Sequence, residues 1–176
     1  DRELYRYYEN VSRALPDDFP VYLYNIPQCA ANDLKPCVVR ELAESCRNVV
    51  GIKYSLPDLL RTDEYLHSRE GFFVMHGTDR LFLPLLAMGC DGTVSGVSNV
   101  YPELFAAVYR AWLDGDIAKA RRMQTIATEA CNLLKSGENM SYFKIGLAHR
   151  GVDAGTMRAP LLDLPPQEGE ALVAAL

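Results

Sequence analysis

The sequence lacks the marks of several large classes of protein. No uninterrupted apolar run among its 176 residues approaches the ~20 that a membrane-spanning helix needs, and the first residues carry charges but no apolar stretch of a signal peptide. The net charge of −5 offers no basic surface for nucleic acid. We therefore expect neither a membrane nor a nucleic acid among the partners of this protein.

Disulfide, metal and dinucleotide motifs are missing as well. The five cysteines are scattered and form no CxxC pair, which favours reduced thiols in a cytoplasmic protein over a disulfide framework or a zinc site. No group of His, Cys and carboxylate residues has the spacing of metal ligands. No G-x-G-x-x-G follows an expected strand, so the dinucleotide fingerprint is absent. We therefore expect no metal-dependent chemistry.

What the sequence does contain is an alternation of strand and helix patterns. Short runs of β-branched and aromatic residues predict four strands, at 21–25, 49–54, 72–75 and 92–97. Apolar residues at three- and four-residue spacing predict the helices between and around them, at 2–14, 36–46, 57–67, 80–88 and 102–114. Asp33 is the expected N-cap of the second helix. The strands then stop, and the remaining helices are expected at 116–135, 139–149 and 167–176.

This alternation indicates a parallel sheet with right-handed crossovers. An open doubly wound sheet and part of a (β/α)8 barrel both satisfy it. The missing dinucleotide fingerprint favours the barrel, as do the polar groups at all four strand ends, where barrel enzymes keep their chemistry. A whole barrel has eight strands and about 250 residues. We therefore expect an α/β fold: the C-terminal half of a (β/α)8 TIM barrel over 1–115, and a C-terminal helical extension of the same domain over 116–176.

The strand ends form one candidate site, because the carboxyl ends of parallel strands lie at the same edge of a sheet. The polar sets there are Tyr24/Asn25, Lys53/Ser55, His76 to Asp79, and Ser95 to Asn99. A lysine in dry surroundings can lose its proton and form an imine with a carbonyl compound. A tyrosine on the neighbouring strand can shuttle protons, and glycines let a substrate approach backbone N–H groups.

Each of these residues also has a purely structural interpretation. Lys53 can be the solvated end of a strand, and Tyr24 a core aromatic with a satisfied hydroxyl. His76 can be a hydrogen-bonded residue at a strand end, and Asp79 the cap of the next helix. The glycines and serines can serve turns. The functional interpretation is favoured because all four strand ends carry such groups together.

The motifs at these ends resemble the dihydrodipicolinate synthase / N-acetylneuraminate lyase family. The resemblance rests on Tyr24-Asn25-Ile26-Pro27, on Lys53 within Gly51-Ile52-Lys53, and on the segments 77–79 and 89–100, which follow in order at compatible spacing. It spans essentially the whole chain, including the last helices.

The resemblance implies a class I aldolase or lyase on a (β/α)8 barrel, usually a homo-tetramer, that needs no cofactor. Lys53 would form the Schiff base with the C2 carbonyl of pyruvate or another 2-oxo acid, and Tyr24 would donate and accept the proton at the scissile bond. Substrate-binding positions would be Gly77, Asp79, Ser95 and Gly96. The partners would be pyruvate and a small aldehyde or 2-oxo acid.

Two departures from the family pattern bear on activity. The family's N-terminal half, with the Gly-Thr-Thr-Gly-Glu type motif that holds the pyruvate carboxylate, is absent, so we expect the chain alone to be inactive. Arg80 stands where sialic-acid lyases usually have glutamate, and Gly96 where they usually have serine. Tyr54 stands where synthases usually have an acidic residue. The run from Lys53 to Ser55 is closer to aldolases of 2-keto-3-deoxygluconate-like acids.

These observations lead to one favoured hypothesis and two alternatives. The favoured function is a Schiff-base lyase that splits a 2-oxo-3-deoxy sugar acid into pyruvate and an aldehyde. Dihydrodipicolinate synthase or N-acetylneuraminate lyase activity is the alternative within the family, because the chemistry at Lys53 is shared. An inactive half-barrel that serves only as a structural part of an oligomer is the alternative of another class, because four strands leave two open edges.

Overall fold

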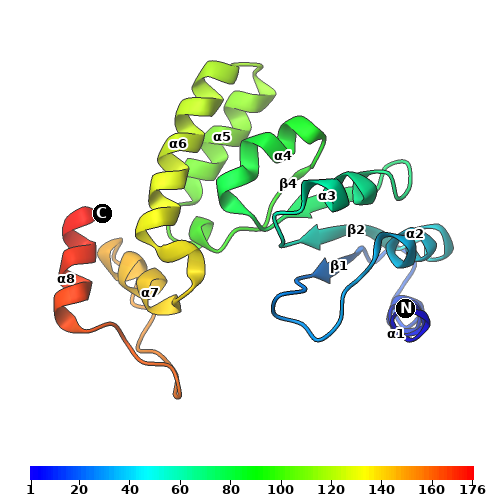
Figure 1. The fold of residues 1–176 in the computed structure, drawn as a ribbon, viewed down its shortest axis with the longest axis horizontal. Coiled ribbons are helices and arrows are strands. Elements are labelled where there is room, and N and C mark those ends of the chain that lie inside the picture. Colours follow the sequence, from blue (N-terminus) through cyan, green and yellow to red (C-terminus); the bar gives the residue numbers. More distant parts are fainter. The chain divides into compact units, whose positions relative to one another are not determined.

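The computed structural model describes residues 1–176, which divide into two compact units, 1–94 and 95–176 (Figure 1). The first unit alternates strands and helices: α1 (Arg2–Arg13), β1 (Val21–Asn25), α2 (Pro36–Ser45), β2 (Val49–Tyr54), α3 (Leu59–Leu66), β3 (Phe73–His76), the 3₁₀ turn η1 (Asp79–Leu81), α4 (Phe82–Met88) and β4 (Gly92–Thr93). The second unit is helical: η2 (Val97–Asn99), α5 (Pro102–Leu113), α6 (Ile117–Leu133), η3 (Lys135–Gly137), α7 (Met140–His149) and α8 (Pro166–Ala175).

The four strands form one parallel sheet in the order β1-β2-β3-β4, so each strand lies beside its neighbour in sequence. This confirms the expected α/β arrangement of four parallel strands with helices between them. Tyr24 is level with Lys53, and Lys53 is level with Met75. Because side chains alternate between the faces of a strand, the register puts Tyr24 and Lys53 side by side on one face.

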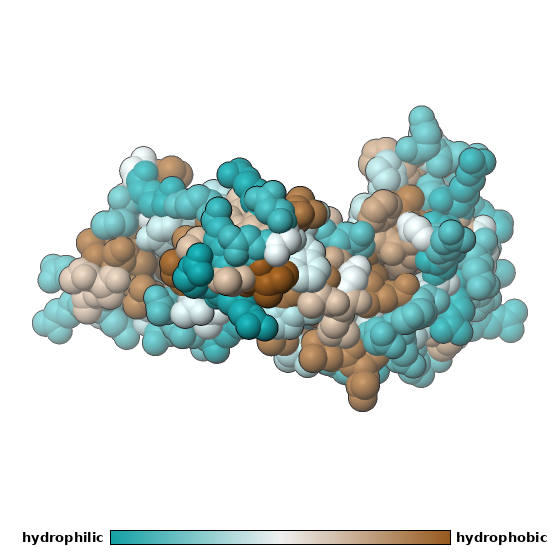
Figure 2. All heavy atoms as spheres, turned by 90° about the horizontal axis from the view of Figure 1, so that it is seen from above, coloured by the Kyte–Doolittle hydropathy of each residue, from teal (hydrophilic) through white to brown (hydrophobic).

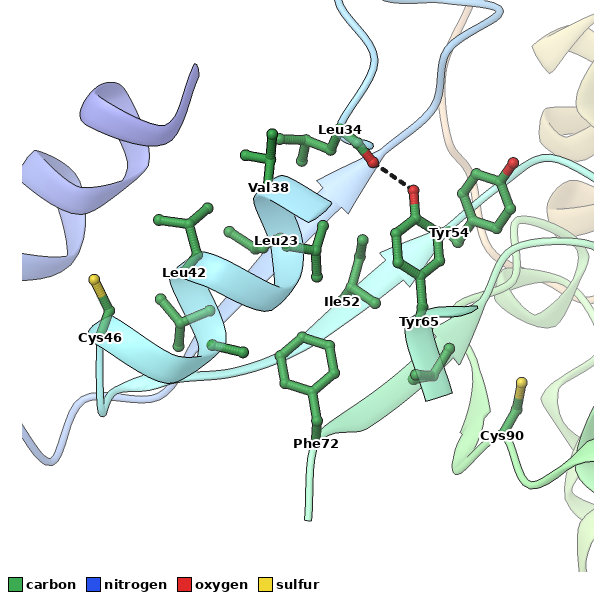
Figure 3. Close-up of a cluster of buried hydrophobic side chains, with 14 of the residues drawn as sticks. Leu23, Leu34, Val38, Leu42, Cys46, Ile52, Tyr54, Tyr65, Phe72 and Cys90 are labelled. Carbon is green, nitrogen blue, oxygen red and sulfur yellow. Dashed lines mark hydrogen bonds between the residues drawn. The ribbon is translucent and has the colours of Figure 1, made fainter. Parts of the chain in front are cut away.

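The core of the first unit lies on the other face of the sheet. Leu23 and Ile52 project from β1 and β2 toward α2, whose Val38 and Leu42 meet them (Figure 3). All four side chains are almost completely buried. The β-branched and leucine residues of the two strands therefore do what their pattern predicts, and this packing fixes which residues face away from the core.

Two tyrosines close the end of this core near the carboxyl edge of the sheet. Tyr54 and Tyr65 pack edge to face with their ring centroids 5.1 Å apart, and both are fully buried. The Tyr65 hydroxyl donates to the carbonyl of Leu34, drawn as a dashed line in Figure 3, and accepts from Asn25. The Tyr54 hydroxyl is buried and makes no hydrogen bond of ordinary geometry; burial raises its pKa, and the Arg61 guanidinium partly offsets that rise.

This difference between two neighbouring tyrosines predicts unequal losses of folding stability for the same substitution. Tyr65→Phe is expected to lower the free energy of unfolding by about 1–2 kcal/mol, because it removes two buried hydrogen bonds. Tyr54→Phe is expected to change it by less than about 0.5 kcal/mol, since the hydroxyl it removes makes no hydrogen bond of ordinary geometry. Urea unfolding of both variants measures the two values, and equal losses would contradict the assignment of the hydrogen bonds.

The face opposite the core carries aromatic side chains that are only half-buried. Tyr22, Tyr24 and Phe73 are 44%, 46% and 44% exposed. Gly51 lies among them, and a Cβ there would come within 2.5 Å of the Phe73 carbonyl oxygen and the Tyr22 ring, so only glycine fits this point of β2. Hydrophobic side chains also lie among the hydrophilic ones on the face drawn in Figure 2.

Two local predictions were wrong. The strand expected at 92–97 ends at Thr93, because Ser98 donates its backbone N–H to the Ser95 hydroxyl and its own hydroxyl to the Ser95 carbonyl, each at 2.9 Å, and so turns the chain into η2. Asp33 does not cap α2. The N-cap is Lys35, followed by a proline in the first turn, and Asp33 bonds to Asn25 and Arg61 instead.

In the second unit α5 lies along α6, and α7 packs with α8 (Figure 1). Helix α6 buries Ala120, Ala127 and Ala130, while Ile117 in its first turn is 39% exposed. The two compact units divide after Val94. The assignment of 1–115 to the half-barrel and 116–176 to the extension stays a prediction. No helix in the structure combines the length and the apolar character that crossing a membrane requires.

Candidate active site

Lys53 and Tyr24 are in direct contact at the ends of two adjacent strands. The Lys53 ammonium donates to the Tyr24 hydroxyl across 3.0 Å, and Nζ lies 4.1 Å from the centre of the same ring. Tyr24 is 46% exposed, so its interpretation as a core aromatic is wrong. The pair thus presents an amine and a phenol together at the carboxyl edge of the sheet, with the phenol open to solvent.

The surroundings of Tyr24 favour its ionised form. Burial by itself would raise the pKa of the phenol, but the hydrogen bond from Lys53, the nearby Ser55 hydroxyl and the charge of the lysine together lower this pKa below its ordinary value. A phenol whose pKa is lowered exchanges its proton with a neighbouring group more readily near neutral pH. The contact with Lys53 therefore both places the Tyr24 hydroxyl beside the amine and helps to lower the pKa of that hydroxyl.

Gly77 lies against the stem of Lys53. A Cβ at Gly77 would collide with Ser55 Oγ and lie 3.2 Å from Lys53 Cε, and the Gly77 N–H donates to the carbonyl of Tyr54 at 2.8 Å. Any side chain here would push Lys53 or Ser55 aside, so the structure supplies a packing reason for the glycine. The substrate-binding role expected for Gly77 stays a prediction.

His76 and Asp79 flank this glycine from the end of β3. Asp79 begins η1 and is 9% exposed, and its expected role in substrate binding stays a prediction. His76 is fully buried: its Nδ1 accepts from the N–H of Thr78 at 3.1 Å, and its Nε2 lies 3.3 Å from the Thr62 hydroxyl. The structural interpretation of His76, as a hydrogen-bonded residue at a strand end, is confirmed.

The buried His76 predicts a pH dependence of stability. Burial lowers its pKa from the ordinary 6.5 to about 4, so between these values the unfolded chain binds a proton that the folded chain does not. The contribution of His76 to stability is therefore nearly constant above about pH 7 and falls as the pH drops toward 4, by about 2 kcal/mol between pH 7 and pH 5.

Urea unfolding at pH 7 and pH 5 measures this loss. His76→Asn, whose amide oxygen can replace the Nδ1 acceptor, is expected to remove most of the difference between the two pH values. His67→Gln is the matched control, because His67 is exposed and pairs only with Asp63 and its carbonyl. An unchanged difference in the His76→Asn protein would refute the prediction.

Ser95 and Gly96 belong to the second unit. The Ser95 hydroxyl accepts from the N–H of Ser98, and a Cβ at Gly96 would lie 2.9 Å from the ring of Phe143 on α7. Both residues therefore have structural tasks in their own unit, and their substrate-binding roles stay predictions. No three His, Cys, Asp or Glu side chains in the structure are grouped so that they could hold a metal ion.

A polar network that the sequence does not predict lies behind the Tyr24–Lys53 pair. We call it the Asn25 network; it consists of Asn25, Asp33, Leu34, Arg61 and Tyr65. The only sequence signal for it is an asparagine in a strand that otherwise reads as buried on this face. Its partners come from a loop and from α3, and nothing in their spacing points to Asn25.

Comparison with known proteins identifies the family of this chain. The sequence model of the Dihydrodipicolinate synthetase family matches residues 1–176. An uncharacterized DapA-like lyase of Halobacterium salinarum is 36% identical over 170 residues, covering 97% of this chain and 55% of that protein. A 4-hydroxy-tetrahydrodipicolinate synthase of a Hydrogenobaculum species is 31% identical over 169 residues, covering 96% of this chain and 58% of that protein.

The fold agrees as well. The crystal structure of YagE, a prophage protein of the dihydrodipicolinic acid synthase family from E. coli K12 in complex with pyruvate, superposes with a TM-score of 0.88 at 27% identity, over 98% of this chain and 59% of that one. This chain spans a little over half the length of these proteins, which confirms that it corresponds to part of a TIM barrel. The chain belongs to the Dihydrodipicolinate synthetase family.

Proposed function

We propose that this chain carries the imine-forming part of a class I, Schiff-base aldolase or lyase that acts on pyruvate-containing substrates. The observation that supports it most directly is the 3.0 Å contact between the Lys53 amine and the Tyr24 hydroxyl. YagE, which resembles this chain in fold and sequence, is a pyruvate-bound protein. By this proposal the complete protein, meaning residues 1–176 with any chain that accompanies them, is the catalyst.

The proposed reaction begins at Lys53. Its neutral amine attacks the C2 carbonyl of a 4-hydroxy-2-oxo acid to give a carbinolamine, which takes the proton of the Tyr24 hydroxyl and loses water, leaving a protonated imine and the Tyr24 phenolate. Tyr24, as phenolate, takes the proton of the C4 hydroxyl, the C3–C4 bond breaks, and its electron pair moves into the imine to give an enamine while the aldehyde leaves. Protonation of C3 and hydrolysis of the imine release pyruvate and restore Lys53. The electron sink is the imine itself, so the proposal requires no metal or organic cofactor.

The favoured substrate class is a 2-oxo-3-deoxy sugar acid. Tyr54 supports it, because the position after Lys53 is an uncharged side chain buried in the core, whereas the synthases of the family usually carry an acidic residue there. The alternative is the condensation that forms 4-hydroxy-tetrahydrodipicolinate, which the name of the Hydrogenobaculum relative supports. Assembly as a homo-oligomer, a tetramer by resemblance to the family, is part of the proposal.

A substrate panel tests the proposed function. The complete protein is incubated with 2-keto-3-deoxygluconate, with N-acetylneuraminate and with the substrates of the 4-hydroxy-tetrahydrodipicolinate condensation. We expect pyruvate release from the first to be the fastest reaction. Faster turnover of either other substrate would assign the alternative within the family. If the complete protein neither turned over any substrate nor attached pyruvate, the inactive half-barrel that serves only as a structural part of an oligomer would be favoured. Inactivity of residues 1–176 alone would not favour it, because that result is already expected.

A further inference from the structure

The contacts on the open face of the sheet do not by themselves fix the position of the Tyr24 side chain. Tyr24 lies at the carboxyl end of β1, which pairs in parallel with β2. The side chain is about half exposed, and its hydroxyl accepts a hydrogen bond from Lys53 at 3.0 Å. The position of the phenol therefore depends mainly on the contacts that hold the end of β1 in place.

Asn25, the next residue along β1, provides the anchor on the opposite face. It is 2% exposed, and its amide nitrogen lies 2.9 Å from Asp33 Oδ1 and 2.9 Å from the Tyr65 hydroxyl. Its amide oxygen accepts from the N–H of Leu34 at 3.3 Å. A single side chain thus ties the end of β1 to the end of the following loop and to helix α3.

Arg61 completes this anchor with a charge. Its Nη1 donates to Asp33 Oδ2 at 2.7 Å, while Asp33 Oδ1 takes the hydrogen bond from Asn25. Both charged side chains are about one-third exposed or less, so solvent screens this pair less than a fully exposed one. The carboxylate of Asp33 is held between the Asn25 amide on β1 and the Arg61 guanidinium on α3. It therefore links the helix to the end of the strand.

The loop after Tyr24 is fixed at its other end to the strand of Lys53. Gln28 donates to the carbonyl of Ser55 at 2.6 Å, and the Ser55 N–H donates to the carbonyl of Asn25 at 3.0 Å. Segment 30–35, together with Tyr24, Asn25 and α1, also lines a pocket of about 650 Å³. The loop therefore holds the end of β1 against the end of β2 and forms one wall of the hollow beside the phenol.

We infer that Asn25, Asp33 and Arg61 are positioning residues, which hold the Tyr24 hydroxyl against the Lys53 amine from the opposite face of β1. The expected loss of kcat rests on the proposed function, whereas the expected displacement of the Tyr24 hydroxyl does not. Consecutive residues of a strand point to opposite faces, so a displacement of Asn25 moves Tyr24 with it. A displacement of about 1 Å in a catalytic group costs a reaction roughly 10²-fold.

The test uses Asn25→Ala, Arg61→Leu and Arg61→Lys in the complete protein. We expect the first two to lower kcat roughly 10- to 100-fold, with KM and the trapping of pyruvate on Lys53 within about twofold of wild type. Arg61→Lys keeps a cation beside Asp33 and is expected to recover most of kcat. Asp63→Asn is the matched control: Asp63 is an exposed carboxylate on the same helix and faces His67, so all parameters should stay at wild-type values.

Spectrophotometric titration of the Tyr24 phenol gives a second readout that needs no activity. Each protein is compared with its own Tyr24→Phe version, which isolates one phenol among ten tyrosines. In Asn25→Ala and Arg61→Leu the pKa of Tyr24 is expected to rise toward its ordinary value, because the phenol moves away from Lys53. In Arg61→Lys and Asp63→Asn it should stay at the wild-type value.

The outcomes separate this inference from the proposed function. Failure of the wild-type protein to trap pyruvate would reject the proposed function, while the titration alone would still decide the positioning role. Variants that keep wild-type kcat and Tyr24 titration would overturn the inference. Equal losses of trapping and kcat would also overturn it, because they indicate a general loss of structure. Should Asn25→Ala not fold by circular dichroism, the comparison of Arg61→Leu with Arg61→Lys decides.

Discussion

Replacing Lys53 with arginine is expected to abolish the attachment of pyruvate in the presence of borohydride and to reduce C–C cleavage to the background of the assay. Arginine keeps the positive charge next to Tyr24, but its guanidinium stays protonated at all accessible pH values and supplies no neutral amine. The imine therefore cannot form, whereas the electrostatic surroundings of the site are preserved. Intact-protein mass spectrometry after reduction measures the attachment, and a coupled assay for pyruvate measures the cleavage.

Lys35→Arg is the matched control for this experiment. Lys35 is an exposed lysine that pairs with Asp1 at 3.0 Å, in the same unit of the structure as Lys53. It should trap pyruvate at the level of the wild-type protein. A Lys53→Arg protein that traps pyruvate equally well would falsify the assignment of the imine to Lys53.

Tyr24→Phe is expected to separate imine formation from bond cleavage. The variant keeps the ring over which the Lys53 ammonium lies at 4.1 Å, but removes the hydroxyl that accepts its hydrogen bond. Loss of a general acid–base group lowers kcat by about 10²–10⁴-fold. Attachment of pyruvate to Lys53 should persist, at a reduced rate, because the amine remains. Steady-state kinetics and borohydride trapping of the same preparation measure both effects.

Tyr22→Phe controls for the loss of a hydroxyl from the same strand face. Tyr22 lies two residues before Tyr24, is 44% exposed and has its ring 6.5 Å from that of Phe73. We expect the kcat of Tyr22→Phe to remain within about twofold of wild type, since the hydrogen bond and the ring contact of Lys53 are both with Tyr24. If Tyr22→Phe and Tyr24→Phe had the same kcat, the proton transfer would have to be assigned to another group.

The central part of the site follows from the sequence because few physical rules are needed to build it. Ile52 is an apolar β-branched residue that packs in the core, and strand alternation then sends the next residue, Lys53, to the other face. Parallel neighbours in sequence order bring Tyr24 level with it. The contact between amine and phenol is the result of two strand patterns and one register.

The rest of the site depends on contacts that local patterns do not contain. Asp33 satisfies the rule for an N-cap, yet it bonds to Asn25 and Arg61, because a tertiary ion pair competes with the local cap. The Gly-rich run after Thr93 has the composition of a strand, yet Ser95 and Ser98 bond to each other and turn the chain. Side chains of Asp and Ser have several possible partners, and only the folded chain selects among them.

Mapping the site of pyruvate attachment tests the central claim most directly. The complete protein is reduced with borohydride in the presence of pyruvate, digested and sequenced by mass spectrometry. The chain has five lysines, Lys35, Lys53, Lys119, Lys135 and Lys144, and only Lys53 donates to a tyrosine hydroxyl among the hydrogen bonds of the structure. We predict that the adduct lies on Lys53. An adduct on any other lysine, or none at all in a protein that cleaves its substrate, would contradict this account.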